Sequence, residues 1–361
     1  MDTNNENLYY IWLTQIKGVG AITGRKLLSI FKSPEKIYEL NMEELLQADG
    51  IGMERARQII QSKDLTKAKA ILKSCYDKNI KISNINDNIF PNILKKYDDS
   101  PILVYYKGYL NRELIGVAIV GSRRCSEYGK KVAVEAAGFL ARNNVPVISG
   151  MAEGIDGYSH TACLNAGGVT VAILGYGVDI CYPKAHDMLM KKIIENGTVI
   201  SEYPPGTSPK PGYFLKRNRI ICALASKVLI AESGEKSGAL IAAEYAIKQE
   251  KELYVVSGNI FCREFKGSNK LISEGAKIYL NPKQLVDGIE VNTFIEIENK
   301  QVTSTNNALE EKIIEILKFE SLTIDDIVSK IKIDKDEIID ILFMMEINNK
   351  VKAIRGKYVA N

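Results

Sequence analysis

One pattern, a short apolar segment followed by a glycine-rich loop and a helix, recurs from Gly116 to Leu280. The apolar segments are uninterrupted, which is typical of strands buried on both faces of a parallel sheet covered by helices. In such a sheet the loops at the carboxyl ends of the strands share one edge, and ligands bind there. That edge is rich in glycine, arginine and lysine, so we expect a ligand that carries phosphate groups. The repeats are VAIV-GSRR, PVIS-GMAEGID, VAIL-GYGVD, VIS-EYPPG, VLIA-ESGEKSG and YVV-SGNIF.

The repeat predicts an α/β fold with a Rossmann-like doubly wound sheet, flanked by smaller units. With 361 residues the chain is long enough for two or three domains. We expect a helical unit over residues 1–85, the Rossmann-like domain over 86–286, a polar linker over 287–307 and a winged-helix unit over 308–361. Residues 87–108 are expected to add an edge strand to the sheet. Within the sheet domain, helices are expected over 128–142, 156–166, 187–195, 214–225, 238–249 and 268–275.

Composition is that of an ordinary globular protein, with 46% hydrophobic residues, 25% charged residues and a net charge of +4. The net charge supports a polyanionic partner only weakly, because local clustering of charge matters more. Six cysteines at irregular spacings and two histidines form no metal-binding motif, so we expect reduced thiols, no metal and no cofactor. The polar N-terminus and the lack of a long apolar run predict a cytoplasmic protein without a membrane span.

The helical unit contains a duplicated pattern, at residues 16–31 and 48–60, in which a G-x-G turn separates two helices. The pattern resembles the helix-hairpin-helix element, whose glycine turn presents backbone N–H groups to a nucleic-acid phosphate. Two interpretations stay open: contact with DNA, or a docking bundle whose tight turns simply need glycine. The basic residues of the second helices are Arg25, Lys26, Arg55 and Arg57.

The tail ends in three expected helices and a short hairpin, an order typical of a winged helix. Thr323 and Asp334 are the expected N-caps, and the hairpin is expected to turn at residues 355–357. A winged helix often contacts DNA bases through its third helix. Here residues 334–349 contain five acids and one lysine, so we expect contact with protein, or regulation, instead.

The loop after the first strand, Gly121 to Arg124, is the sharpest candidate phosphate site. We expect the turn at Gly121 to expose backbone N–H groups, and the next helix to direct its positive end at the loop. Ser122 adds a hydroxyl donor, while Arg123 and Arg124 add charged, forked donors that suit phosphate oxygens. The alternative is a loop with two solvated arginines.

Residues 203–231 carry five cations and no acid, with aromatic residues between them. This mixture suits a single strand of nucleic acid, which offers both phosphates and unstacked base faces. A mononucleotide would not need five cations over such a length. The alternative is a surface loop that is basic by accident. The cations are Lys210, Lys216, Arg217, Arg219 and Lys227, and the aromatic residues are Tyr203, Tyr213 and Phe214.

Asp156 stands at an expected helix start, and His160 follows one turn later on the same face. Three roles stay open for Asp156: a helix cap, a partner that orients Arg123, or a ligand of a ribose hydroxyl. No serine or cysteine nucleophile stands beside the pair, so we favour a structural or ligand-orienting His160 over a catalytic one.

Two segments imitate nucleotide-binding motifs without completing them. The G-x-G of residues 175–177 has no third glycine, and Glu235 stands where a P-loop requires glycine before Lys236. We therefore expect neither ATP hydrolysis nor ordinary NAD chemistry.

Taken in order, the motifs of the central domain resemble the DprA/Smf family of DNA-processing proteins. The resemblance implies a non-enzymatic protein that binds single-stranded DNA, dimerises through the Rossmann-like domain and assists the loading of RecA recombinase in DNA uptake and recombination. One departure is Glu153, which reverses the charge of the arginine usual in the family's second motif. The matching segments are residues 121–129, 149–160, 174–184, 201–209, 217–221, 232–246 and 267–276.

The resemblance also implies which residues contact DNA phosphates. These are Ser122, Arg123, Lys184, Arg217, Asn218 and Arg219. The matching motifs extend the candidate site to Gly121, Arg124, Ser149, Gly150, Ser237 and Gly238, with Asp156 and His160 in support, and the basic, aromatic stretch adds Lys210 and Phe214.

Two other functions stay open. A nucleotide hydrolase of the phosphoribohydrolase type would use a related Rossmann variant, and Glu244 is retained here, although the loop before it lacks that enzyme's PGG and threonine. An adaptor that binds recombinase without DNA is the other possibility.

Overall fold

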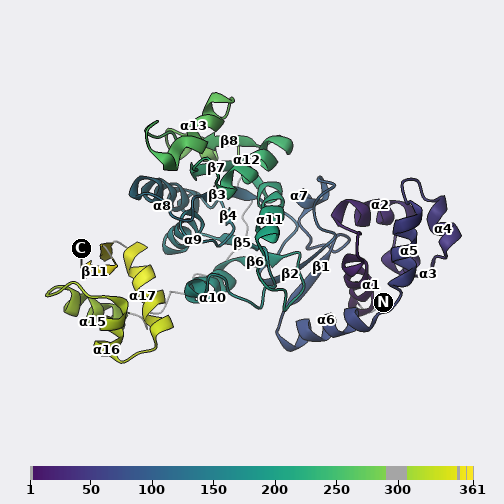
Figure 1. The fold of residues 1–361 in the computed structure, drawn as a ribbon, viewed down its shortest axis with the longest axis horizontal. Coiled ribbons are helices and arrows are strands. Elements are labelled where there is room, and N and C mark those ends of the chain that lie inside the picture. The colour runs from purple at the N-terminus through teal and green to yellow at the C-terminus, as the bar shows by residue number, and fades with distance from the viewer. Residues whose placement is uncertain (1–2, 290–306, 348–349, 355, 361) are drawn as a thin grey trace.

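A computed structural model describes residues 3–289, 307–347, 350–354 and 356–360, which form three parts along the chain. The helical part and the C-terminal part lie at opposite ends of a central sheet domain (Figure 1). Most of the expected linker, 290–306, and Arg355 of the expected hairpin turn lie outside the described residues. Within the described residues, no helix is both long and apolar enough to cross a bilayer.

The central sheet is built from short strands. They are β1 (Lys81–Asn84), β2 (Leu103–Gly108), β3 (Gly116–Gly121), β4 (Val147–Ser149), β5 (Thr170–Leu174), β6 (Thr198–Ser201), β7 (Ala225–Glu232), β8 (Glu252–Val255) and β9 (Lys277–Ile278). Their order is β1-β2-β6-β5-β4-β3-β7-β8-β9. Neighbours from β6 to β9 are parallel, whereas β1 and β2 add an antiparallel edge. The sheet winds outward from β3 in both directions, so the doubly wound fold is confirmed, and its switch lies between β3 and β7.

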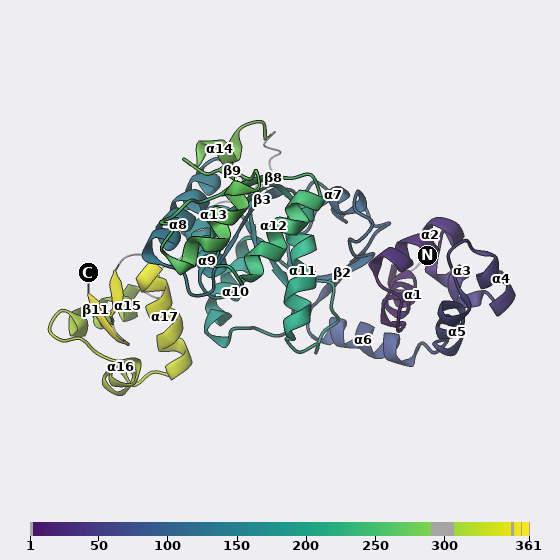
Figure 2. The same cartoon turned by 45° about the horizontal axis from the view of Figure 1, so that its top comes forward.

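Helices cover both faces of the sheet (Figure 2). Alternate residues of β3 show why its apolar run is continuous: Val117 and Ile119 belong to one core, and Ala118 and Val120 to another. The helices are α7 (Asn92–Lys95), α8 (Glu127–Arg142), α9 (Ile155–Asn165), α10 (Asp187–Asn196), α11 (Pro211–Leu224), α12 (Gly238–Lys248), α13 (Lys266–Ser273) and α14 (Lys283–Val286), with the short 3₁₀ turns η1 (Lys184–His186) and η2 (Arg263–Phe265). The expected helices of this domain are found within a few residues of these bounds.

The N-terminal part contains the expected duplicated hairpin. Its helices are α1 (Thr3–Gln15), α2 (Ala21–Phe31), α3 (Pro34–Glu39), α4 (Met42–Gln47), α5 (Met53–Gln61) and α6 (Thr66–Asp77). Gly18 and Gly50 adopt positive φ angles of 80° and 75°, which favour glycine, in the turns before α2 and α5. The sheet begins earlier than expected, because β1 falls inside the range 1–85 that was expected to be helical.

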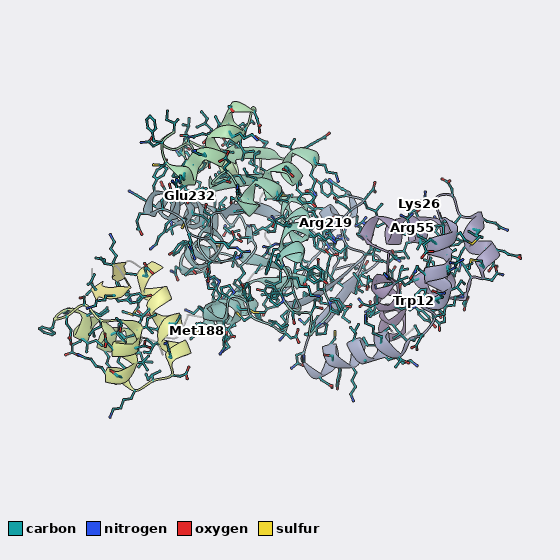
Figure 3. The ribbon with its side chains drawn as sticks, viewed as in Figure 1. Trp12, Lys26, Arg55, Met188, Arg219 and Glu232 are labelled. Atoms are coloured by element: carbon teal, nitrogen blue, oxygen red, sulfur yellow. The ribbon has the colours of Figure 1, made fainter. Side chains whose placement is uncertain are left out.

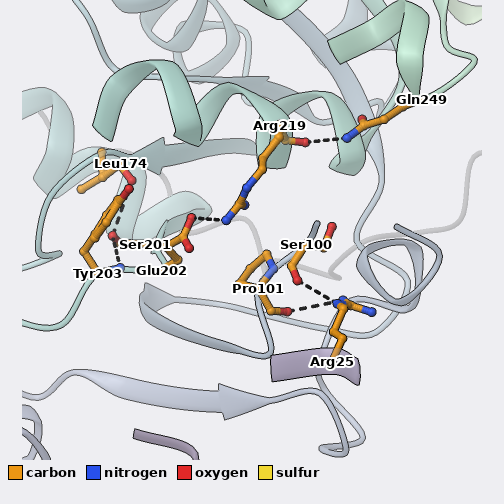
Figure 4. A network of polar contacts seen from close by, with 9 residues as sticks. All are labelled: Arg25, Ser100, Pro101, Leu174, Ser201, Glu202, Tyr203, Arg219 and Gln249. Carbon is orange, nitrogen blue, oxygen red and sulfur yellow. Dashed lines mark hydrogen bonds and ion pairs between the residues drawn. The ribbon is translucent and has the colours of Figure 1, made fainter. Parts of the chain in front are cut away.

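Arg25 connects the N-terminal part to the sheet domain. Its guanidinium donates hydrogen bonds to the carbonyl oxygens of Ser100 at 2.7 Å and Pro101 at 3.4 Å (Figure 4). It also donates to the carbonyl oxygens of Leu94 at 2.8 Å and Lys95 at 3.2 Å. Burial lowers the pKa of this guanidinium, although Asp98 and Asp99 oppose the effect. Arg25 is therefore a docking residue, and it is not available to a phosphate.

Replacing Arg25 with alanine should loosen this docking by about 2–3 kcal/mol, because buried carbonyls lose a charged donor. Limited proteolysis should then cut the segment between β1 and β2 faster than in the native protein. Arg55→Ala is the matched control, since Arg55 is exposed and its hydrogen bond of 3.2 Å to the Gly50 carbonyl stays within its own part (Figure 3). Equal cleavage rates for the two variants would contradict the docking role.

The C-terminal part follows the expected order of three helices and a hairpin. Its elements are α15 (Asn307–Leu317), α16 (Ile324–Ile331), α17 (Lys335–Ile347), β10 (Val351–Ile354) and β11 (Lys357–Ala360). Thr323 caps α16 as expected, in a reciprocal pair with Asp326. Assignment of this part to the winged-helix class, like the domain boundaries, stays a prediction.

Candidate phosphate-binding site

A cavity of about 710 Å³ opens at the carboxyl edge of the sheet, at the switch between β3 and β7. Ligands of doubly wound sheets bind at this position. Loops that follow β3, β4 and β7 contribute to the lining, together with the start of α11. Of the expected site, Gly121, Ser122, Arg123, Arg124, Asp156, Phe214, Arg217, Asn218, Ser237 and Gly238 line this cavity.

Three cations line the cavity with exposed side chains. Arg123 and Arg124 come from the loop after β3, and Lys236 comes from the loop after β7. The Arg123 guanidinium lies over the ring of Phe214, 5.3 Å from its centroid, which holds the charge at the cavity. Lys236 was not among the expected site residues, although its place in a loop at the sheet's carboxyl edge could have indicated it.

The start of α8, which the sequence suggested would face a ligand, is paired with a carboxylate of the protein. The Glu232 carboxylate accepts hydrogen bonds from the backbone N–H of Ser126 at 2.9 Å and from its hydroxyl at 2.5 Å. The positive end of α8 is therefore already paired with a protein anion. The backbone N–H of Ser122 is likewise used, because it donates to the Glu232 carbonyl at 2.9 Å. The backbone N–H of Ser122 is therefore not available to a ligand.

Arg217 forms part of the wall of the cavity from inside the protein, with only 4% of its surface exposed. Its guanidinium donates to the carbonyl oxygens of Gly150, at 2.6 Å, and Ile173. Among the described residues its buried Nε has no hydrogen-bond partner. Arg217 fixes the ends of β4 and β5 and adds positive charge beneath the cavity.

Asp156 holds the loop after β4 in place. Its carboxylate accepts hydrogen bonds from the backbone N–H groups of Gly150 at 3.1 Å and Ala152 at 3.4 Å. Burial raises the pKa of this carboxyl, while the charge of Arg217 and these N–H donors act in the opposite direction. The arrangement supports a structural role in the loop, next to the cavity that Asp156 lines.

His160 is buried and structural. The Thr170 hydroxyl donates to the Val147 carbonyl at 2.8 Å, so we assign the proton to His160 Nδ1, which lies 2.6 Å from that hydroxyl. Burial lowers the pKa of His160 to about 3, and the charges of His186 and Arg217 add to the effect. The ring is therefore neutral near pH 7, and it is not part of the cavity lining.

Aromatic rings gather at the start of α11. Phe214 and Tyr182 both line the cavity, with ring centroids 5.8 Å apart, and Tyr182 is 46% exposed. Lys210 lies over the ring of Tyr213 at 5.6 Å, and that ring stacks on Tyr203 at 4.3 Å. The expected interleaving of basic and aromatic side chains is thus present in space.

Several expected site residues lie outside the cavity lining. Arg219 points away from it and pairs with Glu202 at 2.5 Å, and both side chains are mostly buried (Figure 4). Lys227 donates to carbonyls of the α14 region instead of facing the edge. Ser149 donates to the Ile119 carbonyl within the sheet. Lys184 and Lys210 are exposed. Lys184 lies two residues after Tyr182, and Lys210 lies between Pro209 and Pro211, all three of which line the cavity. Within the described part of the chain, no cluster of His, Cys, Asp or Glu could hold a metal ion.

The fold and this cavity define a Rossmann-like protein with a basic, aromatic site at the switch of its sheet. Residues 81–290 match the family of DNA recombination-mediator protein A, and residues 12–62 match a SAM-like helix-hairpin-helix tandem. The chain belongs to the DNA recombination-mediator protein A family, also called DprA or Smf. The resemblance in the sequence is therefore confirmed.

Individual relatives agree with this assignment. DNA processing protein DprA of Streptococcus pneumoniae is 38% identical over 208 residues, which cover 57% of this chain and 73% of that protein. Protein Smf of a Synechocystis species is 32% identical over 288 residues, 78% of this chain and 72% of that protein. The crystal structure of the S. pneumoniae protein superposes with a TM-score of 0.68 at 31% identity, covering 79% of this chain and 99% of that one. A structure of DNA processing protein A from Helicobacter pylori, which gives insight into that protein's single-stranded DNA-binding mode, has a TM-score of 0.52 at 29% identity and covers 58% of this chain and 95% of that one.

Proposed function

We propose that this protein binds single-stranded DNA at the cavity between β3 and β7 and acts in recombination without catalysis. The observation that carries the proposal is the convergence of three exposed cations with two aromatic rings. Arg123, Arg124 and Lys236 offer charge to phosphates, and Phe214 and Tyr182 offer faces to unpaired bases. The H. pylori relative, whose DNA-binding mode is single-stranded, supports the same choice of ligand.

A nucleotide hydrolase is less well supported by the cavity. Glu244, the residue retained from that class, is exposed on α12 and is not part of the lining. Asp156 is tied to backbone donors, and His160 is buried and neutral. None of these three side chains is therefore placed to transfer a proton to or from a ligand in the cavity.

The proposal extends to a cytoplasmic protein that loads RecA recombinase and forms a homodimer through the Rossmann-like domain, as the family resemblance implies. Apolar side chains in and just after β9, and in the loop before η2, are exposed and would suit a protein contact. They are Ile260, Phe261, Ile278 and Leu280.

The test is the binding of fluorescent oligonucleotides, measured by anisotropy at several salt concentrations. We expect tighter binding to a single strand than to a duplex of the same length, because only the single strand offers free base faces. Affinity should fall steeply with salt as counterions are released from the strand. Equal affinity for both forms, or release of free base from nucleoside monophosphates, would overturn the proposal.

A further inference from the structure

The third helix of the C-terminal part, α17, is seated on the sheet domain. It contacts α9, η1 and α10. Met188, near the start of α10, lies at this boundary (Figure 3). The surface that receives α17 thus belongs to the same side of the domain as the loops that follow β4 and β5.

The contact is chemically specific. Lys130 of α8 lies 3.8 Å from the Glu346 carboxylate of α17, and the two side chains are only 12% and 18% exposed. The same ammonium lies over the ring of Tyr158, 4.8 Å from its centroid. Burial raises the pKa of the Tyr158 hydroxyl, and the Glu346 charge adds to this rise. A largely buried pair with a second, aromatic partner is a more specific contact than an exposed ion pair.

The seat of α17 adjoins the cavity. Tyr182 lines the cavity, and η1, which α17 contacts, begins at Lys184 two residues later. Asp156, in the first turn of α9, also lines the cavity. A single-stranded DNA that leaves the cavity past Tyr182 would therefore run toward α17.

The charge of α17 is unfavourable for such a strand. Residues 335–347 contain four acids and one lysine. Phosphates close to this helix would be repelled, and the repulsion is strongest where solvent is excluded. Docking of α17 on the surface formed by α9, η1 and α10 and binding of a polyanion at this flank of the domain therefore oppose each other. Each of the two weakens the other by the same factor.

We propose that the C-terminal part is an internal cover, in which α17 occupies the flank beside Lys184 until a long single strand displaces it. This inference rests on the proposed function of the cavity. A short oligonucleotide that fills only the cavity leaves the cover in place. A longer one extends along the flank and binds at the cost of undocking α17.

The test uses the full-length protein with Lys130→Glu, Glu346→Lys and the combined charge swap. Undocking should make Lys130→Glu bind a long single strand about fivefold more tightly than the native protein, although the change removes a positive charge near the site. Glu346→Lys should behave alike, and the swap should return the affinity toward the native value. A short oligonucleotide should show a much smaller gain in every variant.

Lys131→Glu is the matched control, because Lys131 is the neighbouring, exposed residue of α8 and the charge change is the same. It should bind the long strand no more tightly than the native protein. Small-angle X-ray scattering without DNA supplies a second readout: both single variants should have a larger radius of gyration, and the swap should restore it.

The outcomes separate the two proposals. If no variant and no native protein binds DNA, the proposed function fails, while the scattering still reports whether Lys130 and Glu346 hold the cover. If Lys130→Glu leaves the scattering unchanged, the Lys130–Glu346 pair does not hold α17 on the sheet domain. If a variant has a larger radius of gyration but binds the long oligonucleotide no more tightly than Lys131→Glu, docked α17 does not oppose DNA binding, and the proposal is wrong.

Discussion

Replacing Arg217 with alanine should lower the melting temperature of the sheet domain by roughly 6–12 °C, equivalent to about 3 kcal/mol. The guanidinium is almost fully buried and donates to the carbonyls of Gly150 and Ile173. Its removal would leave these acceptors and the nearby Asp156 carboxylate without their cationic partner, and burial makes that loss costly. Arg217→Lys should recover only part of the loss, because an ammonium cannot reproduce the planar fork.

Scanning calorimetry of the purified variants is the measurement, and Arg124→Ala is the control. Arg124 lines the same cavity but is exposed, so its removal should shift the transition by less than about 2 °C. If Arg217→Ala melts like Arg124→Ala while its DNA affinity falls, Arg217 acts mainly on the ligand. A large thermal shift shows that any loss of binding includes a loss of structure.

Removing both Arg123 and Lys236 should weaken the binding of single-stranded DNA about a hundredfold at moderate salt. Each exposed cation would lose a charged hydrogen bond to phosphate, worth about 1.5–3 kcal/mol, and 1.4 kcal/mol corresponds to about tenfold. Arg123→Ala alone should cost about tenfold and should affect all sequences similarly, since phosphates carry no sequence information. The plot of log affinity against log salt should become flatter by about 0.7 for each phosphate that the protein no longer neutralises.

Anisotropy titrations over a range of salt concentrations measure both quantities. Arg142→Ala is the control for Arg123→Ala, because each variant removes one positive charge. Arg142 is an exposed arginine in the last turn of α8 and does not line the cavity. Its affinity and salt slope should stay close to the native values. Parallel losses in Arg123→Ala and Arg142→Ala would mean that binding follows overall charge and has no defined site.

The fold was predictable because its signals are local and repeated. Each uninterrupted apolar run marks a strand covered on both faces, and each following glycine loop marks the carboxyl edge. The start of the sheet was misjudged because β1 is a short strand at the antiparallel edge, where exposed residues such as Lys81 interrupt the apolar pattern. The winged-helix class of the tail remains a prediction, although its helices and hairpin are in the expected order.

The site was predictable only in part, because sequence shows which charges are present and not which partners they meet. Arg219 stands two residues after Arg217 on α11, yet it faces Glu202, a residue that belongs to the loop after β6. Arg25 has a helix-hairpin-helix setting that suggests phosphate, but tertiary packing gives it carbonyl partners between two parts of the chain. Such pairings depend on segments distant in sequence, and no periodicity encodes them.

The core beneath β5 and β6 does not stop at the border of the sheet domain. Trp12, Leu27 and Ile59 of the N-terminal helices belong to the same buried cluster as Leu174 and Val199 of the strands. Removal of the N-terminal helices would therefore expose one side of this shared hydrophobic core to solvent and make the remaining protein prone to aggregation. The N-terminal helices and these strands thus share one continuous interior, so a substitution in either of them changes the packing of both.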